Sequence, residues 1–430
     1  MSTLIVRNGW VIDVEPEPTV RRNIDISISD GRIVAVGPNL PADDAEVIDA
    51  TGHLVLPGFV DTHRHLWQTT LRSSAVDVDL RQYLDRTHGV AGPLIRPEDV
   101  HAGNLVGALE CLDSGITTVQ DHSHVQFSPA HSDAAITALA DAGIRAVFGY
   151  GYPVLDAAAR RPAEVRRVRE QYFASGDQLL TLRLAPAGPS YSPVDTVRED
   201  WALARELGLG IAVHVGSGPV AERPVDTLRR HGLLRADTLY VHGNSLPDNE
   251  LQLIADSGGA VSIAPAIEAQ MGHGAPMIGR LRRAGITTGL GVDVVTSTAG
   301  DMFSLMRAAL LSSHLGEGPR LTAAEILQLA TIDGATALGL ADRIGSLQPG
   351  KQADLVLLHA DAPNLAGATH DPIGAVVTAA HPGNVSTVLV AGTPVKQAGR
   401  LQHPALHAKI AEVHQSAHRL ATQIAATTTT

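Results

Sequence analysis

Residues 57–65 read Pro-Gly-Phe-Val-Asp-Thr-His-Arg-His, an apolar extended run that ends in two histidines. In a β-strand, residues i and i+2 point to the same side, so His63 and His65 can offer two imidazole nitrogens to one metal ion. Because the chain has 20 histidines, such a pair can also arise by chance. The pair predicts a metal site only if later strands supply further ligands.

Three later apolar runs end in side chains that can bind a metal or move a proton. Residues 210–214 end in His214, residues 238–242 end in His242, and residues 288–293 end in Asp293. Barrels of alternating strands and helices place their chemistry at the C-terminal ends of the strands. Each residue alone also fits a hydrogen-bonded strand end. Buried histidine and carboxylate groups are costly without a partner, so the series favours a metal centre.

The periodicity predicts an α/β fold with a (β/α)8 TIM-type barrel. Apolar strands alternate with helix-like segments, and with the strand that carries His63 they reach eight, the number expected for this closed parallel barrel. The other seven strands are expected near residues 115–120, 144–149, 180–185, 210–214, 237–242, 259–263 and 286–292.

Short strands with alternating polar and apolar residues flank the predicted barrel at both chain ends. We expect residues 1–56 and 343–403 to form one composite β-sandwich beside a barrel of residues 57–342. Apolar residues at steps of three and four then predict an amphipathic C-terminal helix over residues 404–424.

The composition limits the classes of partner. The formal net charge of −12 argues against nucleic acid and anionic membranes, which leaves a small-molecule substrate. The single cysteine, Cys111, excludes an internal disulfide and a cysteine-based zinc site. With no export signal and no long apolar run in the sequence, we expect a cytoplasmic protein. The sequence leaves a homo-oligomer open.

The strand-end residues, together with residues 345–355 (Gly-Ser-Leu-Gln-Pro-Gly-Lys-Gln-Ala-Asp-Leu), resemble the amidohydrolase superfamily, specifically its chlorohydrolase and cytosine-deaminase-like branch. The resemblance spans nearly the whole chain and implies a (β/α)8 barrel with a composite β-sandwich. It also implies that His242 lies beside a metal-bound water. The implied ligands of one divalent metal ion are His63, His65, His214 and Asp293.

The lysines limit the metal count. Some members of this superfamily bridge two metals with a carboxylated lysine from a barrel strand, whereas the only lysines here are Lys351, Lys396 and Lys409, all outside the predicted barrel. We therefore expect one metal ion. Three imidazoles and a carboxylate suit Zn²⁺ best, and Fe²⁺, Mn²⁺ or Co²⁺ can also bind such a set.

A divalent metal lowers the pKa of a bound water from 15.7 to about 7, which predicts hydrolytic attack on an sp² carbon. Asp293 is expected to take the proton of the water, and His242 to orient it or to stabilise the developing oxyanion. The sequence thus predicts a metal-dependent amidohydrolase that cleaves a C–N bond of a small cyclic or aromatic amide, urea or amidine-like compound.

One residue departs from the pattern of the branch. Its deaminases usually carry a glutamate three residues after the histidine that corresponds to His214, and this chain has Ser217 there. Deamination of a nitrogen heterocycle is therefore the alternative, with Glu222, Glu268 or His124 replacing the acid. A non-catalytic barrel scaffold is the alternative from another class, but it would not need three inward histidines and an aspartate.

Three residues are predicted to contact the substrate. Gln68 lies in residues 66–72, a segment that resembles purine- and pterin-type deaminases. His124 belongs to a second pair, His122 and His124, which lacks evident further ligands for a separate metal. Glu268 follows the seventh strand and could bind a cationic or amino-bearing group. In addition, Tyr150 or Tyr191 could line the pocket.

Overall fold

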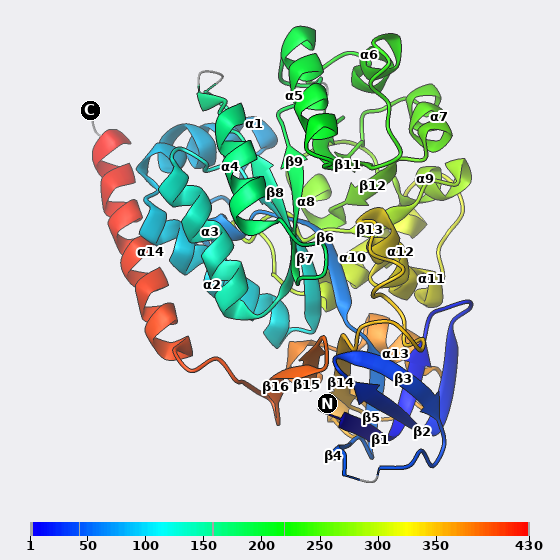
Figure 1. Cartoon of the computed structure of the whole chain (residues 1–430). Helices are drawn as coiled ribbons and strands as arrows, with labels where there is room; N and C mark the ends of the chain where they lie inside the picture. The colour runs from blue at the N-terminus through cyan, green and yellow to red at the C-terminus, as the bar shows by residue number, and fades with distance from the viewer. Residues whose placement is uncertain (1–2, 43, 157–158, 219, 429–430) are drawn as a thin grey trace.

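The computed structural model describes residues 3–42, 44–156, 159–218 and 220–428. The central element of the described residues is a sheet of eight parallel strands, which are neighbours in the sheet in the same order as in the sequence. Figure 1 shows these strands surrounded by helices. The strands are β6 (Phe59–Arg64), β7 (Ile116–Ser123), β8 (Arg145–Gly151), β9 (Leu180–Ala185), β10 (Ile211–Val215), β11 (Thr238–His242), β12 (Ala260–Ile263) and β13 (Thr288–Leu290).

The first and last strands of this sheet meet and close the barrel. Just beyond the end of β13, the Asp293 N–H donates to the His63 carbonyl at 2.8 Å, and the His65 N–H donates to the Asp293 carbonyl at 2.9 Å. β6 and β7 are buried along their whole length, as expected for parallel strands covered on both faces. Closure brings Asp293 beside the two histidines that lie more than 200 residues earlier.

Helices follow most of the barrel strands. The longer of these helices pack their apolar residues on the barrel and turn their polar residues to solvent. The helices of this part of the chain are α2 (Pro97–Asp113), α3 (Pro129–Ala142), α4 (Pro162–Tyr172), α5 (Val194–Glu206), α6 (Pro224–Arg230), α7 (Asp248–Ser257), α8 (Pro265–Gln270), α9 (Ile278–Ala284), α10 (Met302–Leu315), α11 (Ala323–Leu329) and α12 (Ile332–Ala337).

Between β6 and α2 the chain forms four short helical turns. They are η1 (Leu66–Leu71), α1 (Leu80–Tyr83), the π-helix η2 (Leu84–Ala91) and η3 (Gly92–Leu94). A π-helix is rare and often lies at a functional site. These turns follow the strand that carries the paired histidines.

A second sheet combines strands from both chain ends, as the sequence predicts. Its hydrogen-bonded order is β17-β16-β15-β14-β5-β1-β2-β3, with β4 paired to β1. The two chain ends join where β5 and β14 pair antiparallel. The strands are β1 (Thr3–Asp13), β2 (Thr19–Ser29), β3 (Arg32–Gly37), β4 (Glu46–Asp49), β5 (His53–Pro57), β14 (Leu355–His359), β15 (Val385–Val390), β16 (Thr393–Gln397) and β17 (Arg400–Leu401).

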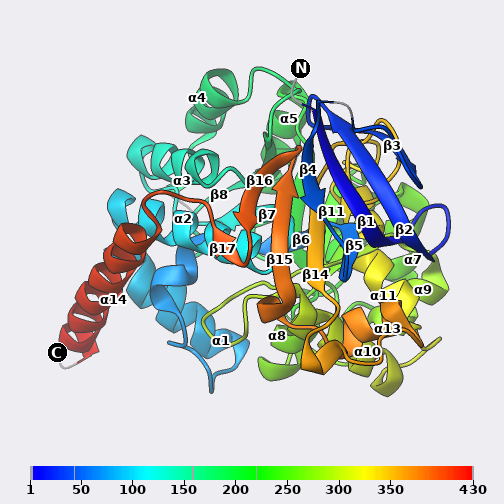
Figure 2. The ribbon, with the colours of Figure 1, turned by 90° about the horizontal axis from the view of Figure 1, so that it is seen from below.

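The composite unit is one continuous hydrogen-bonded sheet with its own core, rather than two separately paired sheets. Register shifts interrupt the pairing of β1 with β2 and of β14 with β15, and such bulges bend strands. Apolar residues of both chain ends, such as Val6, Ile26 and Leu355, share one core. In Figure 2 this sheet lies in front of the barrel, seen from below.

The chain ends with a long helix on the outside of the barrel. α14 (Leu406–Thr428) begins two residues after the start of the predicted helix of residues 404–424 and extends beyond its end, and it lies along α2, away from the composite sheet (Figures 1 and 2). Leu420 on α14 is fully buried, and Arg419 donates to the Leu94 carbonyl at 3.1 Å. Two short helices, α13 (Pro372–Thr378) and η5 (Pro363–Leu365), and the turn η6 (Pro382–Asn384) precede β15.

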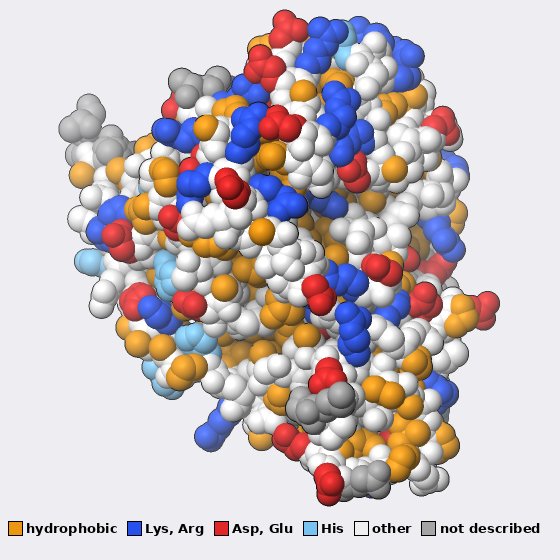
Figure 3. Space-filling view, in the orientation of Figure 1, with side chains coloured by type: hydrophobic (Ala, Val, Ile, Leu, Met, Phe, Trp, Pro, Cys, Tyr) orange, Lys and Arg blue, Asp and Glu red, His pale blue; other side chains and the backbone are white. Residues whose placement is uncertain are grey.

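The surface carries both signs of charge. Figure 3 shows Lys and Arg side chains interspersed with Asp and Glu over the face seen in Figure 1. Among the described helices, none is both long and apolar enough to cross a membrane.

Candidate metal centre

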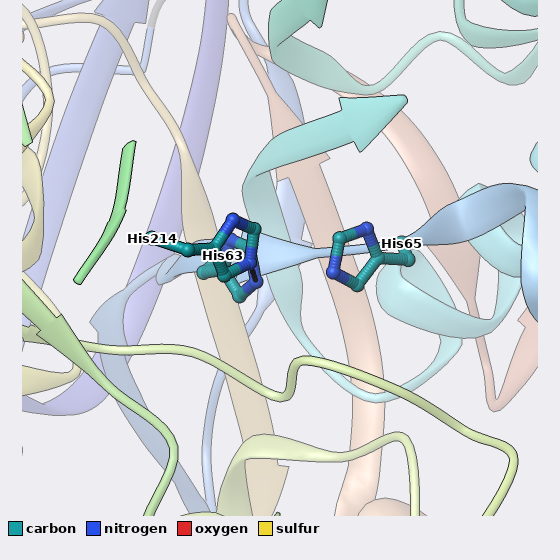
Figure 4. A group of neighbouring side chains, drawn as sticks. All are labelled: His63, His65 and His214. Carbon is teal, nitrogen blue, oxygen red and sulfur yellow. Dashed lines mark hydrogen bonds between the residues drawn. The ribbon is translucent and has the colours of Figure 1, made fainter. Parts of the chain in front are cut away.

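The four predicted ligands converge at one end of the barrel. His63 lies in β6 and His65 directly follows it, His214 comes from β10, and Asp293 follows β13. The His63 Nε2 atom lies 3.3 Å from both His214 Nε2 and Asp293 Oδ1, and His65 Nε2 lies 3.4 Å from Asp293 Oδ1. Figure 4 shows the three imidazoles side by side. A tetrahedral zinc ion with bonds of about 2.0–2.1 Å sets its ligand atoms about 3.3 Å apart, and these three separations fit such an ion.

Burial keeps the imidazoles in the form that binds a metal. Removal from water lowers the pKa of His63 to about 4. Burial, followed by repulsion from neighbouring imidazoles, also holds the pKa of His214 well below its usual value. For Asp293, burial opposes ionisation, but the neighbouring imidazoles of His63, His65 and His242 together outweigh it and hold its pKa well below the ordinary range. Neutral imidazoles and an ionised carboxylate are the species that ligate zinc.

A hydrogen bond to the backbone fixes the orientation of the His65 ring. Its Nδ1 atom lies 2.6 Å from the carbonyl oxygen of His122, so Nδ1 donates and Nε2 is left free for the metal. Such a hydrogen bond on the far side of a ligating histidine selects the tautomer and the orientation of the ring.

The backbone at the site adopts unusual conformations. His242 has φ of 72° and Asp293 has φ of 65°, a left-handed region that costs a residue with a side chain about 1–3 kcal/mol. Gly291 approaches His63 so closely that a Cβ atom there would lie 2.8 Å from the Cβ of His63. Strain and close approach are thus concentrated where the ligands meet.

His242 is held between two carboxylates. Its Nε2 atom lies 3.7 Å from Asp293 Oδ2, and its Nδ1 atom lies 3.2 Å from Glu268 Oε1. Burial disfavours the protonated ring, but the hydrogen bond to Glu268 and the charges of Asp293 and Glu268 outweigh it and raise the pKa of His242. The arrangement makes His242 a basic group beside the ligand set.

Glu268 lies behind His242. Its carboxylate also accepts hydrogen bonds from the Ala264 N–H at 2.7 Å and from Asn244 Nδ2 at 3.2 Å, and the side chain is only 4% exposed. With three donors on it, Glu268 is placed to orient His242 rather than to make the predicted contact with a substrate.

A cavity of about 540 Å³ opens over the ligand set. Its lining combines polar side chains with the apolar Leu80, Leu84, Val154, Met271 and Val294. The polar side chains in the lining are those of His65, Tyr83, His88, His124, Tyr191, His214, Ser217, His242, His273 and Asp293.

The remaining predicted residues divide between the cavity and its surroundings. His124 lines the cavity, and its Nδ1 atom is buried without a hydrogen-bond partner in the described structure. Gln68 is fully buried and donates to the Tyr83 hydroxyl at 2.6 Å, so it supports a lining residue. Tyr191 lines the cavity and Tyr150 is buried outside its lining. Glu222 is exposed and is not among the lining residues.

Sequence reasoning missed three of the polar lining residues. Tyr83 and His88 come from the short helical turns after β6, and His273 from the loop after α8. The His273 ring meets the His242 ring edge-on at 4.7 Å, and burial lowers the pKa of His273 to about 4. These residues stand in short turns without apolar periodicity, so the sequence offered only the histidines themselves as a signal.

His122 and His124 form a second group with His214 that has the spacing of metal ligands. This group has no carboxylate and shares His214 with the first set. Because one imidazole nitrogen binds one ion, the two groups cannot both use the same nitrogen of His214.

Fold and site together define a metal-dependent hydrolase built on a (β/α)8 barrel. Residues 54–395 match the model of the amidohydrolase family. A curated 5-methylthioadenosine/S-adenosylhomocysteine deaminase from Symbiobacterium thermophilum is 31% identical, over 98% of this chain and 99% of the relative. The chain belongs to the amidohydrolase family, and it is a hydrolase that acts on carbon–nitrogen bonds.

Solved structures agree with the fold and the metal. An adenosine deaminase from Xanthomonas campestris with bound zinc has a TM-score of 0.90 and 27% identity, over 98% of this chain and 99% of that one. The atrazine chlorohydrolase from Arthrobacter aurescens, complexed with zinc, has a TM-score of 0.85 at 24% identity, over 96% of this chain and 100% of that one. The described His and Asp groups are able to hold a metal ion, which agrees with the predicted divalent cofactor, and the similar adenosine deaminase binds zinc.

Proposed function

We propose that this enzyme hydrolyses the amidine-type C–N bond of a small nitrogen heterocycle. The observation that carries the proposal is the pair His242 and Asp293, which lines the cavity beside the histidine group of His63, His65 and His214. The deaminases among the relatives act on heterocycles, which supports an aromatic, nitrogen-rich substrate.

In this proposal His63, His65, His214 and Asp293 hold the metal ion. When bound, the ion supplies Lewis acidity, which lowers the pKa of water and polarises the carbon that is attacked. The free oxygen of Asp293 accepts the proton that the attacking water loses. His242, protonated and oriented by Glu268, donates a hydrogen bond to the negative oxygen that develops at that carbon.

The leaving nitrogen must regain a proton, and Ser217 cannot act as the acid that deaminases of this branch usually carry. Asp293 and His242 are the ionisable groups close enough to one another to pass that proton back. We assign this step to the pair, with His124 as a substrate contact because this residue lines the cavity and its buried Nδ1 atom has no hydrogen-bond partner in the described structure.

The test is a hydrolysis screen on zinc-loaded protein that scores ammonia, amine and acid release separately. Aminoheterocycles should give ammonia, and Asp293→Asn should abolish the release. Turnover of none of the aminoheterocycles, with full zinc content, would contradict the proposal.

A second candidate is hydrolysis of a cyclic amide or urea, which the serine at position 217 favours because such a leaving group needs no acid at that position. Acid release without ammonia in the same screen would select it. A cytoplasmic location and a homo-oligomeric state stay predictions from the sequence.

A further inference from the structure

A second hollow adjoins the cavity over the ligand set. It encloses about 1030 Å³, open solvent at its mouth included. The turns η2 and η3 and the loops after β7 and β8 form its walls. Three residues, His88, His124 and Val154, line both hollows, so the two meet there. We call this second hollow the side chamber.

The walls of the side chamber are mainly apolar. Ile95, Val125 and Pro153 are buried, and Phe127 is half-buried. The polar His131 offers little to a ligand because its ring nitrogens lie 2.8 Å from the Ser128 hydroxyl and 3.2 Å from the Ile95 carbonyl. An apolar group that leaves water for these walls gains the hydrophobic free energy of its buried area.

The charge of the lining restricts the occupant further. Among the described residues that line the main cavity or the side chamber, none is Lys or Arg. A phosphate or carboxylate in the chamber would lose its hydration without a cation to replace it, which is costly. The exposed Asp156 also lines the chamber, and its carboxylate repels an anion. An anionic extension is therefore disfavoured, and an uncharged one fits the apolar walls.

We infer that the side chamber binds an apolar substituent of the substrate, while the polar heterocycle lies at the metal centre. The inference rests on the proposed function and adds the substrate class: an uncharged ring that carries an alkyl or aryl group. His88 and His124 stand where ring and substituent would join, with their rings edge-on at 5.4 Å.

Metal-binding probes with tails of increasing length test the inference without knowledge of the substrate. Acetohydroxamate and hexanohydroxamate share one chelating head and differ by four methylenes. Affinity for the zinc-loaded full chain, measured by calorimetry, should rise at least tenfold from the short to the long probe, since each buried methylene can add up to about fourfold. A gain below about threefold would overturn the inference.

Two variants test whether the tail of the long probe binds in the side chamber. A Cβ atom at the exposed Gly89 would lie 3.5 Å from Leu155, so Gly89→Leu narrows the chamber between these two lining residues. Phe127→Ala removes one of its walls. Both variants should reduce the ratio of the two affinities to below about threefold. The matched control is Gly176→Leu, at an exposed glycine with no neighbour near its Cβ position and no place in either lining; it should keep the wild-type ratio.

The outcomes separate this inference from the proposed function. If both chamber variants keep the wild-type ratio, the tail lies elsewhere and the inference is wrong. If neither probe binds, the inference is also wrong. Zinc content and hydrolysis, measured on the wild-type chain without probes, report on the proposed function independently.

Discussion

At the scale of single residues, Glu268 supplies the charge that keeps His242 basic. A buried imidazole loses its proton easily, yet the pKa of His242 is raised because the Glu268 carboxylate lies 3.2 Å from Nδ1. Because the pKa of His242 is raised, the ring stays protonated as the pH rises through the ordinary pKa of histidine. Removal of the charge should therefore shift the loss of the protonated form to lower pH.

Glu268→Gln tests this role, because the amide keeps the shape and loses the charge. We expect kcat to fall at least tenfold, about 1.4 kcal/mol, while the zinc content stays unchanged, and the basic limb of the kcat profile to move to lower pH. Glu268→Asp should recover part of the activity. The exposed Glu222→Gln is the matched control and should behave as wild type. An effect on KM alone would assign Glu268 to substrate binding instead.

Ser217 and Asp293 differ in their capacity for proton transfer. Ser217→Ala should cost less than about tenfold in kcat/KM, because a serine cannot act as the missing acid. Asp293→Asn removes a metal ligand and the proton acceptor together, and should cost at least about a hundredfold. Kinetics of both variants on any substrate found in the screen provide the measurement. Equal losses would make Ser217 a catalytic residue and contradict the mechanism.

The ligand set predicts the metal content. Wild-type protein should hold about one divalent ion per chain by elemental analysis. His63→Ala and His214→Ala should lower that content, since each removes one donor from a four-ligand site. His314→Ala, at an exposed histidine of α10, should leave it unchanged. Full zinc content in both ligand variants would place the metal elsewhere.

At the scale of elements, strand ends were predictable and short turns were not. His63 and His65 share one side because a strand has a period of two, and an apolar run marks the strand before its polar end. The role of Glu268 depends instead on α8, a short helix that turns its carboxylate back onto β11. The helical turns that carry Tyr83 and His88 are also too short for a hydrophobic period, so the sequence could not place them over the cavity.

The C-terminal helix should contribute to stability through its buried face. Leu420→Ala removes a fully buried side chain between α14 and the barrel, which typically costs about 2–5 kcal/mol and lowers the midpoint of thermal unfolding. Leu315→Ala is the control, because Leu315 is 82% exposed. Equal midpoints for the two variants would show that α14 unfolds before the rest of the chain.

At the scale of the whole molecule, the sequence predicts that both chain ends build one β unit, and it leaves the strand order open. Alternating polar and apolar residues identify each strand, but β5 and β14 pair across about 300 residues of chain. Pairing over that distance depends on bulges and on shared core packing. The order of the strands in this one curved sheet is therefore given only by the folded structure.

The barrel and the composite sheet are joined by a buried ion pair. Arg145 at the start of β8 donates from Nε to Asp354 Oδ2 at 2.9 Å and from Nη2 to Oδ1 at 3.0 Å, and each side chain is 2% exposed. Removal of one partner leaves a buried charge without compensation, so Arg145→Met should destabilise the protein by about 3–5 kcal/mol. The exposed pair of Arg166 and Glu206 provides the control: Arg166→Met should leave the stability close to that of wild type, because exposed ion pairs contribute little.

Thermal and urea unfolding of the two arginine variants measure the difference. If Arg145→Met lowers stability at the sheet alone, limited proteolysis should cut the composite unit while zinc stays bound in the barrel. If it lowers the stability of the whole chain in one transition, the ion pair couples the two units, and zinc should be released in the same transition. An Arg145→Met protein as stable as Arg166→Met would contradict the assignment of this contact as the electrostatic link between barrel and sheet.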